Sequence, residues 1–322
     1  MAGRFCADKN FSSQNTRKDA KKIMRKGVAV LMGLMLLAAG SAFAQKNYTG
    51  EIDAWRAKHE ADLKKENGWL TVVGLFWLKD GMNSVGAGDG FDVELTSNFK
   101  GGRFGEINFH DGKAVLRAEP GVEALSGGKP FISGELVSDE FGKQNVITVG
   151  SQSFYLIKRE ERYGIRLKDS NSPARATFTH LDWYKADGKY RVTAKFEKYA
   201  TPKEVLIPNI LGGTFKMQAP GLLKFKLDGR QVSLEPVVEE GEEDTLFIIF
   251  RDQTSRTTTY AAGRFLYADM PKGDTAILDF NKAENPPCAF TNFATCPLPP
   301  QQNRLDIAIP AGEKRYAHPG GH

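Results

Sequence analysis

Asp-Gly pairs punctuate this chain and constrain its fold more than any other feature of the sequence. Asp111-Gly112 stands in GEINFHDGKAVLRAE and Asp228-Gly229 in LLKFKLDGRQVSLEP, each between segments that alternate apolar and polar residues. Such a pair supplies the positive φ angles of a two-residue hairpin turn, and alternation at period two is typical of strands. Asp187-Gly188, in THLDWYKADGKYRVTAKFEKY, predicts a third hairpin. With 33 glycines in 322 residues, the chain is expected to be mainly β.

A helix is predicted near the start, over residues 48–66. Trp55, His59 and Leu63 recur there every four residues with charged residues on the other faces, and Gly68 follows as a terminator. His59 is interpreted as a core residue because it lies on the apolar face. The next ten residues, WLTVVGLFWL, are apolar almost throughout and predict a buried turn and strand.

Residues 24–44 have the pattern of a secretory signal peptide. A short basic start precedes the apolar run 28–39, and Ala42 and Ala44 give the small-x-small pattern of a cleavage site. The apolar run is shorter than the roughly 20 residues that span a bilayer. We therefore expect cleavage after Ala44 and a periplasmic or secreted protein with no membrane span. Residues 1–23 are either an extension ahead of the true start or part of a long leader.

Removing this leader changes the charge of the chain. The full sequence has 44 basic and 39 acidic residues; the leader holds eight and two of them, so the net charge falls from +5 to −1. The electrostatic case for nucleic acid or an anionic membrane as partner disappears with it. Cys6 also leaves, so Cys288 and Cys296 are the cysteines that remain.

The remaining 278 residues can bury a full core as one or two domains. Asp169 to Pro173 is the best candidate boundary. We expect the leader 1–44, a helix with a β-sandwich domain over 45–172, a second β-rich, barrel-like domain over 173–316, and a tail over 317–322. In the second domain, TLFIIFRD predicts a central strand that pairs with SRTTTYAAGRFLYAD.

Cys288 and Cys296 lie together in the proline-bracketed segment NPPCAFTNFATCPLPP. They could form a disulfide, bind a metal, or act as a nucleophile and its partner. A zinc site usually has four ligands with CxxC or HxxxH spacing, and no histidine is near. In an oxidising compartment two thiols are expected to pair, which would stabilise the fold by about 2–3 kcal/mol in the chain-entropy model. The favoured prediction is a structural disulfide.

Known catalytic and cofactor motifs are absent from the sequence. There is no Gly-x-Ser-x-Gly elbow, and VGAGDGF lacks the third glycine and the βαβ context of a dinucleotide loop. No metal-binding word is found, and no cofactor is predicted. Among the histidines, His180 in FTHLDWY has the most plausible site environment, although a structural role is favoured there too.

Polar residues gather in the β-type segments near the C-terminus. If these strands are neighbours, their polar groups converge at one end of a sheet, either as a buried hydrogen-bonded network or as a ligand pocket. The candidate residues are Glu197, Arg251, Asp252, Arg264, Asp279, Asn281, Asn285 and Asn303.

Several words of the sequence resemble a known bacterial family. They are GWLTVVGLFWLKDGMNSVG, YRVTAKFEKY, DQTSRTTTYAAGRFLYAD, DFNKAENPPCAFTNFATCPLPPQQNRL and IPAGEKRY. From about Trp55 to Tyr316 the chain is similar to the domain-of-unknown-function family numbered 1684. The resemblance implies an extracytoplasmic or soluble bacterial protein and implies no particular activity.

The first half also resembles forkhead-associated domains. LKDGMNSVGAGDGFDVEL, GEINFHDGKAVLRA and NVITVGSQSFYLI follow the order of landmarks in these small β-sandwiches. The family binds phosphothreonine through an arginine after its glycine turn, a Ser-x-x-His word and an Asn-Gly word. Here Ala87 follows the turn and the other two words are missing. The resemblance therefore implies the scaffold without the phosphopeptide function.

Two functions are compatible with these patterns. The first is a ligand-binding or accessory module of the cell envelope, with a small-molecule or envelope-related ligand in the second domain. The alternative is a metal-independent hydrolase or lyase in which Asp252 or Asp279 is the acid/base and Arg264 binds an anion. Two carboxyls facing an open cleft near Arg264 would favour the enzyme, and their burial in hydrogen-bonded networks would count against it.

Overall fold

The computed structural model describes residues 47–142 and 144–317. The predicted signal peptide lies outside these residues, and cleavage after Ala44 stays a prediction. Contacts divide the chain into two compact units, residues 1–53 and 54–322. A helix runs from residue 47 to 63, which confirms the predicted helix with a slightly earlier end. No helix in the described ranges is long and apolar enough to cross a membrane.

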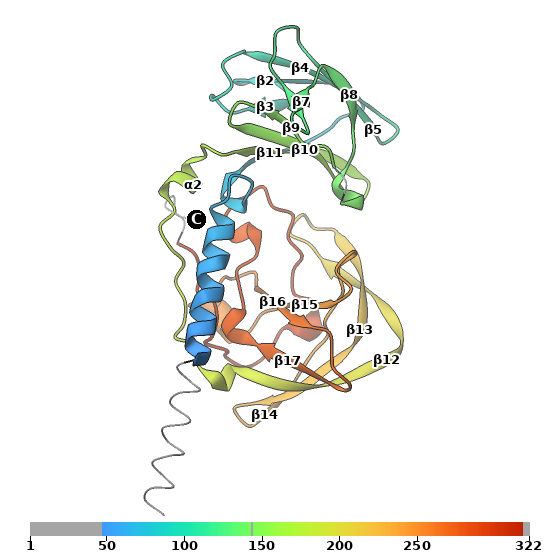
Figure 1. Ribbon diagram of the computed structural model, residues 1–322. Coiled ribbons are helices and arrows are strands. Elements are labelled where there is room, and N and C mark those ends of the chain that lie inside the picture. Colours follow the sequence, from blue (N-terminus) through green and yellow to red (C-terminus); the bar gives the residue numbers. More distant parts are fainter. Residues whose placement is uncertain (1–46, 143, 318–322) are drawn as a thin grey trace, which may run out of the picture. The chain divides into compact units, whose positions relative to one another are not determined.

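The first half of the larger unit is a β-sandwich of two sheets (Figure 1). One sheet has the order β1-β11-β10-β9-β6-β7 and the other β3-β2-β4-β5-β8. All neighbouring strands are antiparallel except β2 and β3. The first sheet comprises β1 (Val72–Trp77), β11 (Arg162–Asp169), β10 (Gln152–Arg159), β9 (Ile147–Val149), β6 (Leu125–Ser126) and β7 (Lys129–Pro130). The second comprises β3 (Val93–Leu95), β2 (Gly81–Ala87), β4 (Arg103–His110), β5 (Lys113–Ala118) and β8 (Ser133–Leu136).

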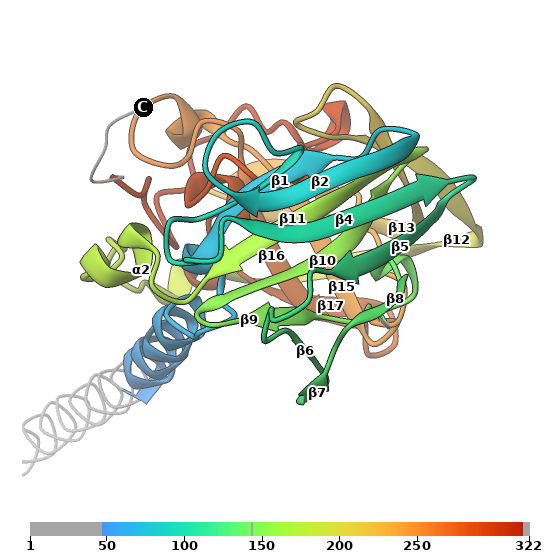
Figure 2. The ribbon, with the colours of Figure 1, turned by 90° about the horizontal axis from the view of Figure 1, so that it is seen from above.

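Alternating side chains from the two sheets form the sandwich core. In β5, Ala114, Leu116 and Ala118 are buried while the residues between them are exposed. Phe104 of β4 meets Phe154 of β10 edge to face, with ring centroids 5.4 Å apart. The sheets lie over one another with their strands in similar directions (Figure 2), as in aligned sandwich packing.

Two of the three predicted hairpins are confirmed. Asp111 and Asp228 have φ angles of 49° and each precedes a glycine with positive φ, and the strands on either side are paired. The hairpin predicted at Asp187 is wrong. Asp187 instead caps a short 3-10 helix, η3 (Gly188–Tyr190), by accepting the N–H of Lys189, because such local side-chain bonds compete with strand pairing.

The second half of the unit contains a four-stranded and a two-stranded sheet. The four-stranded sheet has the order β14-β13-β12-β17, and the predicted pairing of β15 with β16 is confirmed. Their bounds are β12 (Arg191–Pro208), β13 (Thr214–Leu227), β14 (Arg230–Leu234), β15 (Thr245–Phe250), β16 (Arg264–Asp269) and β17 (Thr275–Asp279). Isolated bridges Gln218↔Val238 and Val237↔Phe247 link the two sheets. No continuous ladder closes these described strands into a barrel, so the expected barrel-like domain is an open pair of sheets.

The chain after β17 has no further strands in its described part, yet it enters several apolar cores. Ile309 and Ala311 join the core of the four-stranded sheet, Ala294 and Cys296 join the core around β15, and Phe290 packs with Leu63 of the first helix. This segment, residues 280–317, is called the C-terminal wrap below. The helical turns of the unit are η1 (Trp69–Thr71), η2 (Asp139–Phe141), α2 (Pro173–Thr177), η4 (Gln253–Arg256), η5 (Phe280–Lys282), η6 (Pro287–Ala289) and η7 (Gln301–Asn303).

The predicted fold class, mainly β with an N-terminal helix and a leading β-sandwich, is confirmed. The predicted division of domains at residue 172 stays a prediction.

Candidate functional site

The predicted group around Arg264 is a buried structural tie. The Arg264 side chain is fully buried, and its Nη2 donates to Asp252 Oδ2 at 3.1 Å and to the carbonyl of Ile309 at 3.0 Å. Its Nη1 donates to the carbonyl of Ala311. Asp252 Oδ2 also accepts the backbone N–H of Ile309 at 2.7 Å. The pair thus fastens the C-terminal wrap to β16 and to the end of β15.

The second carboxylate oxygen of Asp252, Oδ1, also accepts hydrogen bonds from within the protein. Asp252 is the N-cap of η4, where its Oδ1 accepts the backbone N–H of Thr254 at 3.1 Å and the Thr254 hydroxyl at 2.6 Å. With both oxygens bonded inside the protein, this carboxylate is occupied by capping and by its ion pair. It is not placed to exchange protons with a ligand.

Asp279 and Asn281 form a separate network. Asn281 donates to Asp279 Oδ1 from its backbone at 3.1 Å and from its side chain at 3.0 Å. Its side chain also exchanges hydrogen bonds with the backbone of Asp187, at 2.9 and 3.0 Å. These contacts anchor the turn that leads into β12.

The remaining predicted residues are dispersed. Asn303 donates to the carbonyls of Glu235 and Ile249, both at 3.0 Å, and its backbone carbonyl accepts the N–H of Arg251. Glu197 is half-buried on β12 and pairs with Lys224 at 2.6 Å. The expected convergence at one end of a sheet is not observed. Both candidate carboxyls, Asp252 and Asp279, are buried, so the geometry lacks the open cleft that the enzyme alternative required.

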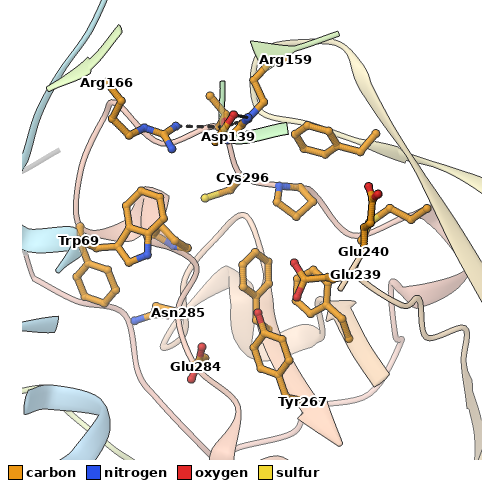
Figure 3. Close-up of a pocket in the computed structure, with 18 of the residues that line it drawn as sticks. Trp69, Asp139, Arg159, Arg166, Glu239, Glu240, Tyr267, Glu284, Asn285 and Cys296 are labelled. Carbon is orange, nitrogen blue, oxygen red and sulfur yellow. Dashed lines mark hydrogen bonds and ion pairs between the residues drawn. The ribbon is translucent and has the colours of Figure 1, made fainter. Parts of the chain in front are cut away.

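A cavity of about 680 Å³ lies elsewhere in the same unit (Figure 3). Of the predicted site residues, Asn285 and Cys296 line it. Other lining residues come from the first helix, η1, β10, β11, β13, β15, β16 and the C-terminal wrap. The cavity is therefore built by segments that are far apart in sequence.

Aromatic side chains form much of its wall. Phe247 packs edge to face on Phe265 at 4.8 Å and stacks on Tyr267 at 4.9 Å between ring centroids. Trp69 and Phe290 contribute further aromatic surface. Such rings offer a large apolar contact area of fixed shape.

Acidic and basic groups meet in another part of the lining. His59 Nδ1 lies 3.2 Å from Glu284 Oε2, and its Nε2 lies 3.7 Å from Glu313 Oε2. Glu313 is fully buried and accepts the backbone N–H of Asn285 at 2.7 Å and its side-chain amide at 2.6 Å. The His59 ring stacks on Trp55 with centroids 5.4 Å apart, which fixes its orientation.

The pKa values of Glu284 and His59 are shifted by their surroundings. Burial raises the pKa of Glu284 to about 7; the positive charge of His59 opposes this shift, and the charge of Glu313 adds to it. Burial disfavours protonated His59, but the neighbouring Glu313 and Glu284 outweigh it and raise the pKa of His59. Glu284 can therefore hold or release a proton near neutral pH.

Two arginines of the sandwich line the opposite side of the cavity. Arg159 pairs with both oxygens of Asp139, at 3.0 and 2.9 Å, and donates to the Thr295 hydroxyl at 2.9 Å. Arg166 donates to the same hydroxyl at 3.4 Å and lies over the Trp69 ring, 5.4 Å from its centroid. Figure 3 shows Arg166, Arg159 and Asp139 along one edge of the cavity, away from Glu284.

The two cysteines are adjacent free thiols in the structure. The backbone N–H of Cys288 donates to Cys296 Sγ at 3.1 Å. A hydrogen bond with Cys296 lowers the pKa of the Cys288 thiol, and the same contact, together with burial, raises the pKa of Cys296. The sulfurs are not bonded to each other, so the expected disulfide is not present in this structure.

Sequence reasoning did not identify most of the residues of this site. His59 was interpreted as a core residue, whereas the favoured histidine, His180, is exposed beside Asp182. The spacing of Trp55 and His59 marked the correct helix face, but a face that borders a cavity has the same pattern as one that borders a core. Among the described residues, no three His, Cys, Asp or Glu side chains are arranged to hold a metal ion.

Comparison with known proteins yields one family and several solved structures. Residues 176–314 match the family described as "Protein of unknown function (DUF1684)". The solution NMR structure of an uncharacterized protein of Haloarcula marismortui is 34% identical, with 44% of this chain and 78% of that chain covered and a TM-score of 0.37. The FHA structure of Rv0020c is 19% identical, with 30% and 92% covered and a TM-score of 0.20. No curated protein matches the chain.

The buried tie predicts a large stability effect for Asp252→Asn. The substitution leaves Arg264 charged and unpaired inside the protein, which should cost about 3–5 kcal/mol in the free energy of unfolding. The double variant D252N/R264M removes that charge and should recover part of the loss. Denaturant unfolding measures both. Glu197→Gln is the control expected to change little, because it removes only a partly exposed ion pair with Lys224. A D252N protein as stable as the wild type would show that the tie is unimportant.

The raised pKa of Glu284 predicts a pH-dependent stability. The folded protein holds this proton more tightly than the unfolded chain, so stability should fall as pH rises from about 4.5 through about 7. His59, with its raised pKa, acts in the same direction above pH 6.5. Glu284→Gln should flatten this decline in thermal unfolding, whereas Glu94→Gln on the exposed face of β3 should not. An unchanged slope in E284Q would contradict the assignment.

Proposed function

This chain belongs to the family described as protein of unknown function (DUF1684), and from that premise we propose that it is an exported protein of the cell envelope that binds a small molecule in the cavity lined by His59 and Glu284. The single observation that carries the proposal is the cavity itself. Its volume of about 680 Å³ falls within the roughly 300–1,000 Å³ of small-molecule sites.

The composition of the lining supports binding of an organic molecule. Ligand sites combine apolar walls with a few convergent polar groups that fix orientation. Here the rings of Phe247, Phe265 and Tyr267 supply the apolar wall. Glu284 and Arg166 supply polar groups at separate places. A molecule with an apolar body and polar ends would match this distribution.

The proposed location in the envelope rests on the sequence. Residues 24–44 have the order of a signal peptide, and the chain that follows it is close to neutral in net charge. In that oxidising compartment Cys288 and Cys296 would be joined as a disulfide. Their proximity, with the N–H of Cys288 on Cys296 Sγ at 3.1 Å, is compatible with closure by a small local movement.

A second candidate function is catalysis in the same cavity. The observation that favours it is Glu284, whose pKa of about 7 suits a general acid or base at neutral pH. His59 at 3.2 Å could relay or stabilise the proton. The hydrolase or lyase alternative then depends on Glu284 and His59 in place of Asp252, Asp279 and Arg264.

The binding proposal predicts that narrowing the cavity removes ligands. Met217 lines the cavity, whereas Met82 is exposed on β2 and does not. In saturation-transfer NMR against a set of small aromatic acids, alcohols and amides, Met217→Trp should lose most hits and Met82→Trp should keep them. Equal hits in wild type and M217W would contradict the proposal. Turnover of a bound compound that is lost in E284Q, with binding retained, would establish the second candidate instead.

Export predicts a particular mature protein. Mass spectrometry of material from the periplasm or medium should find an N-terminus near Gln45 and a peptide in which Cys288 is linked to Cys296 under non-reducing conditions. Replacing both cysteines by serine should then lower the free energy of unfolding by about 2–3 kcal/mol. Free thiols at both positions in exported material would contradict the disulfide, and retention of residues 1–44 would contradict the cleavage.

A further inference from the structure

Arg166 is a buried cation with little compensation from the protein. It lies in the middle of β11, is 3% exposed, and lines the cavity. Burying a charged group is costly unless it is paired and hydrogen-bonded. No carboxylate among the described residues lies within ion-pair distance of Arg166, and its Nε is a buried donor without a partner. Within the described part of the chain, its guanidinium makes one hydrogen bond, the 3.4 Å contact with the neutral hydroxyl of Thr295.

Two other arginines, the half-buried Arg159 and the buried Arg264, have carboxylate partners. Arg159 has both oxygens of Asp139, and Arg264 has Asp252 with two backbone carbonyls. A guanidinium has five N–H donors in a fixed planar fork. At Arg159 and Arg264 a carboxylate accepts from this fork, whereas no carboxylate of the described residues does so at Arg166.

A second cation lies on the same strand as Arg166. Lys168, on the same face of β11, has its pKa lowered by burial and then by the charge of Arg166. The contact of Arg166 with the Trp69 ring offers a modest attraction and no neutralising charge. Of the carboxylates that line the cavity, Asp139 lies on the same edge as Arg166 but pairs with Arg159, and Glu140 pairs with Lys158. Glu239, Glu240 and Glu284 lie away from Arg166 (Figure 3).

We infer that the ligand of this cavity carries one anionic group, a carboxylate or a phosphate, which binds to the guanidinium of Arg166. This inference rests on the proposed function and specifies its ligand class. An arginine fork matches both anions with paired hydrogen bonds. Trp69 and Phe290 would cover the apolar body beside that group. The acidic far side disfavours a second anionic group there, so the ligand enters with a defined direction.

The far end of the ligand is matched by a hydrogen-bonding group. Burial raises the pKa of Glu239, with Glu242 adding to the effect, and Glu284 has a pKa of about 7. Glu284 can therefore carry a proton near neutral pH and donate a hydrogen bond to a hydroxyl or carbonyl. An amphipathic organic acid or phosphate monoester with a neutral polar end has this chemistry.

Matched probes test the anionic group. Calorimetric titration of the purified protein compares 3-phenylpropionate, 2-phenylethyl phosphate and the neutral 3-phenylpropionamide. At least one anion should bind the wild type on the order of tenfold or more tightly than the amide, since a hydrogen bond to a charged group is worth about 1.5–3 kcal/mol. The tighter of the two anions identifies carboxylate or phosphate as the natural group.

Two variants assign this preference to Arg166. Arg166→Gln should bring the anion and the amide to nearly equal affinity. Arg162→Gln is the control, because Arg162 is an exposed arginine of the same strand that lies over Trp77, outside the cavity. Equal binding of anions and amide by the wild type, or a preference retained in R166Q, would overturn the inference while leaving the cavity as a ligand site. A protein that binds neither these probes nor any compound of the wider set contradicts the proposed function itself.

Stability provides an independent readout. If the charge of Arg166 is kept for a ligand, Arg166→Met should unfold at the wild-type temperature or above, because it removes an unpaired buried charge. A clear fall in Tm would show that the protein itself satisfies the guanidinium, and it would overturn the inference.

Discussion

The fully buried ion pair of Arg264 and Asp252 is the contact on which the second half of this protein depends. The wrap has no strand ladder of its own, so its backbone groups need partners elsewhere. Arg264 takes the carbonyls of Ile309 and Ala311, and Asp252 takes the N–H of Ile309. Two buried charges are expensive alone but tolerable when they are paired and hydrogen-bonded, as these are at Asp252 and at the Nη atoms of Arg264. The pair therefore holds an irregular segment of chain against the sheets with a single fixed geometry.

The cavity is a consequence of how that segment is held. Glu313 lies two residues beyond Ala311, so the tie holds the segment that carries it. Glu284 exchanges two backbone hydrogen bonds with Phe265, the residue after Arg264. Asn285 then fixes Glu313 through two short hydrogen bonds. The result is the carboxyl of Glu284, which can carry a proton, near His59, and the guanidinium of Arg166, whose charge has no carboxylate partner among the described residues, across the cavity. Both arrangements cost stability, which is typical of sites kept for binding or chemistry.

Much of the fold could be predicted from the sequence, and most of the site could not. Asp111 and Asp228 with their following glycines define local turns, so their hairpins needed no tertiary information. Asp187 is also followed by glycine, but its backbone N–H and carbonyl are hydrogen-bonded to the side chain of Asn281, which is distant in the chain. The polar residues near the C-terminus were noticed because buried networks and binding sites use the same residue types. The sequence does not mark Arg166 as a site residue, because it stands in an ordinary strand between Ile165 and Leu167. Only the packing of β11 against the second half, which the sequence does not specify, leaves its charge beside a cavity.

The central claim is that the natural ligand occupies this cavity with an anionic group on Arg166. A crystal structure of the protein after exposure to cell-envelope extract tests it most directly. We expect a non-protein molecule between the aromatic wall and Arg166, with carboxylate or phosphate oxygens within hydrogen-bonding distance of the guanidinium. A ligand bound elsewhere, or one that places a neutral group at Arg166, would contradict it.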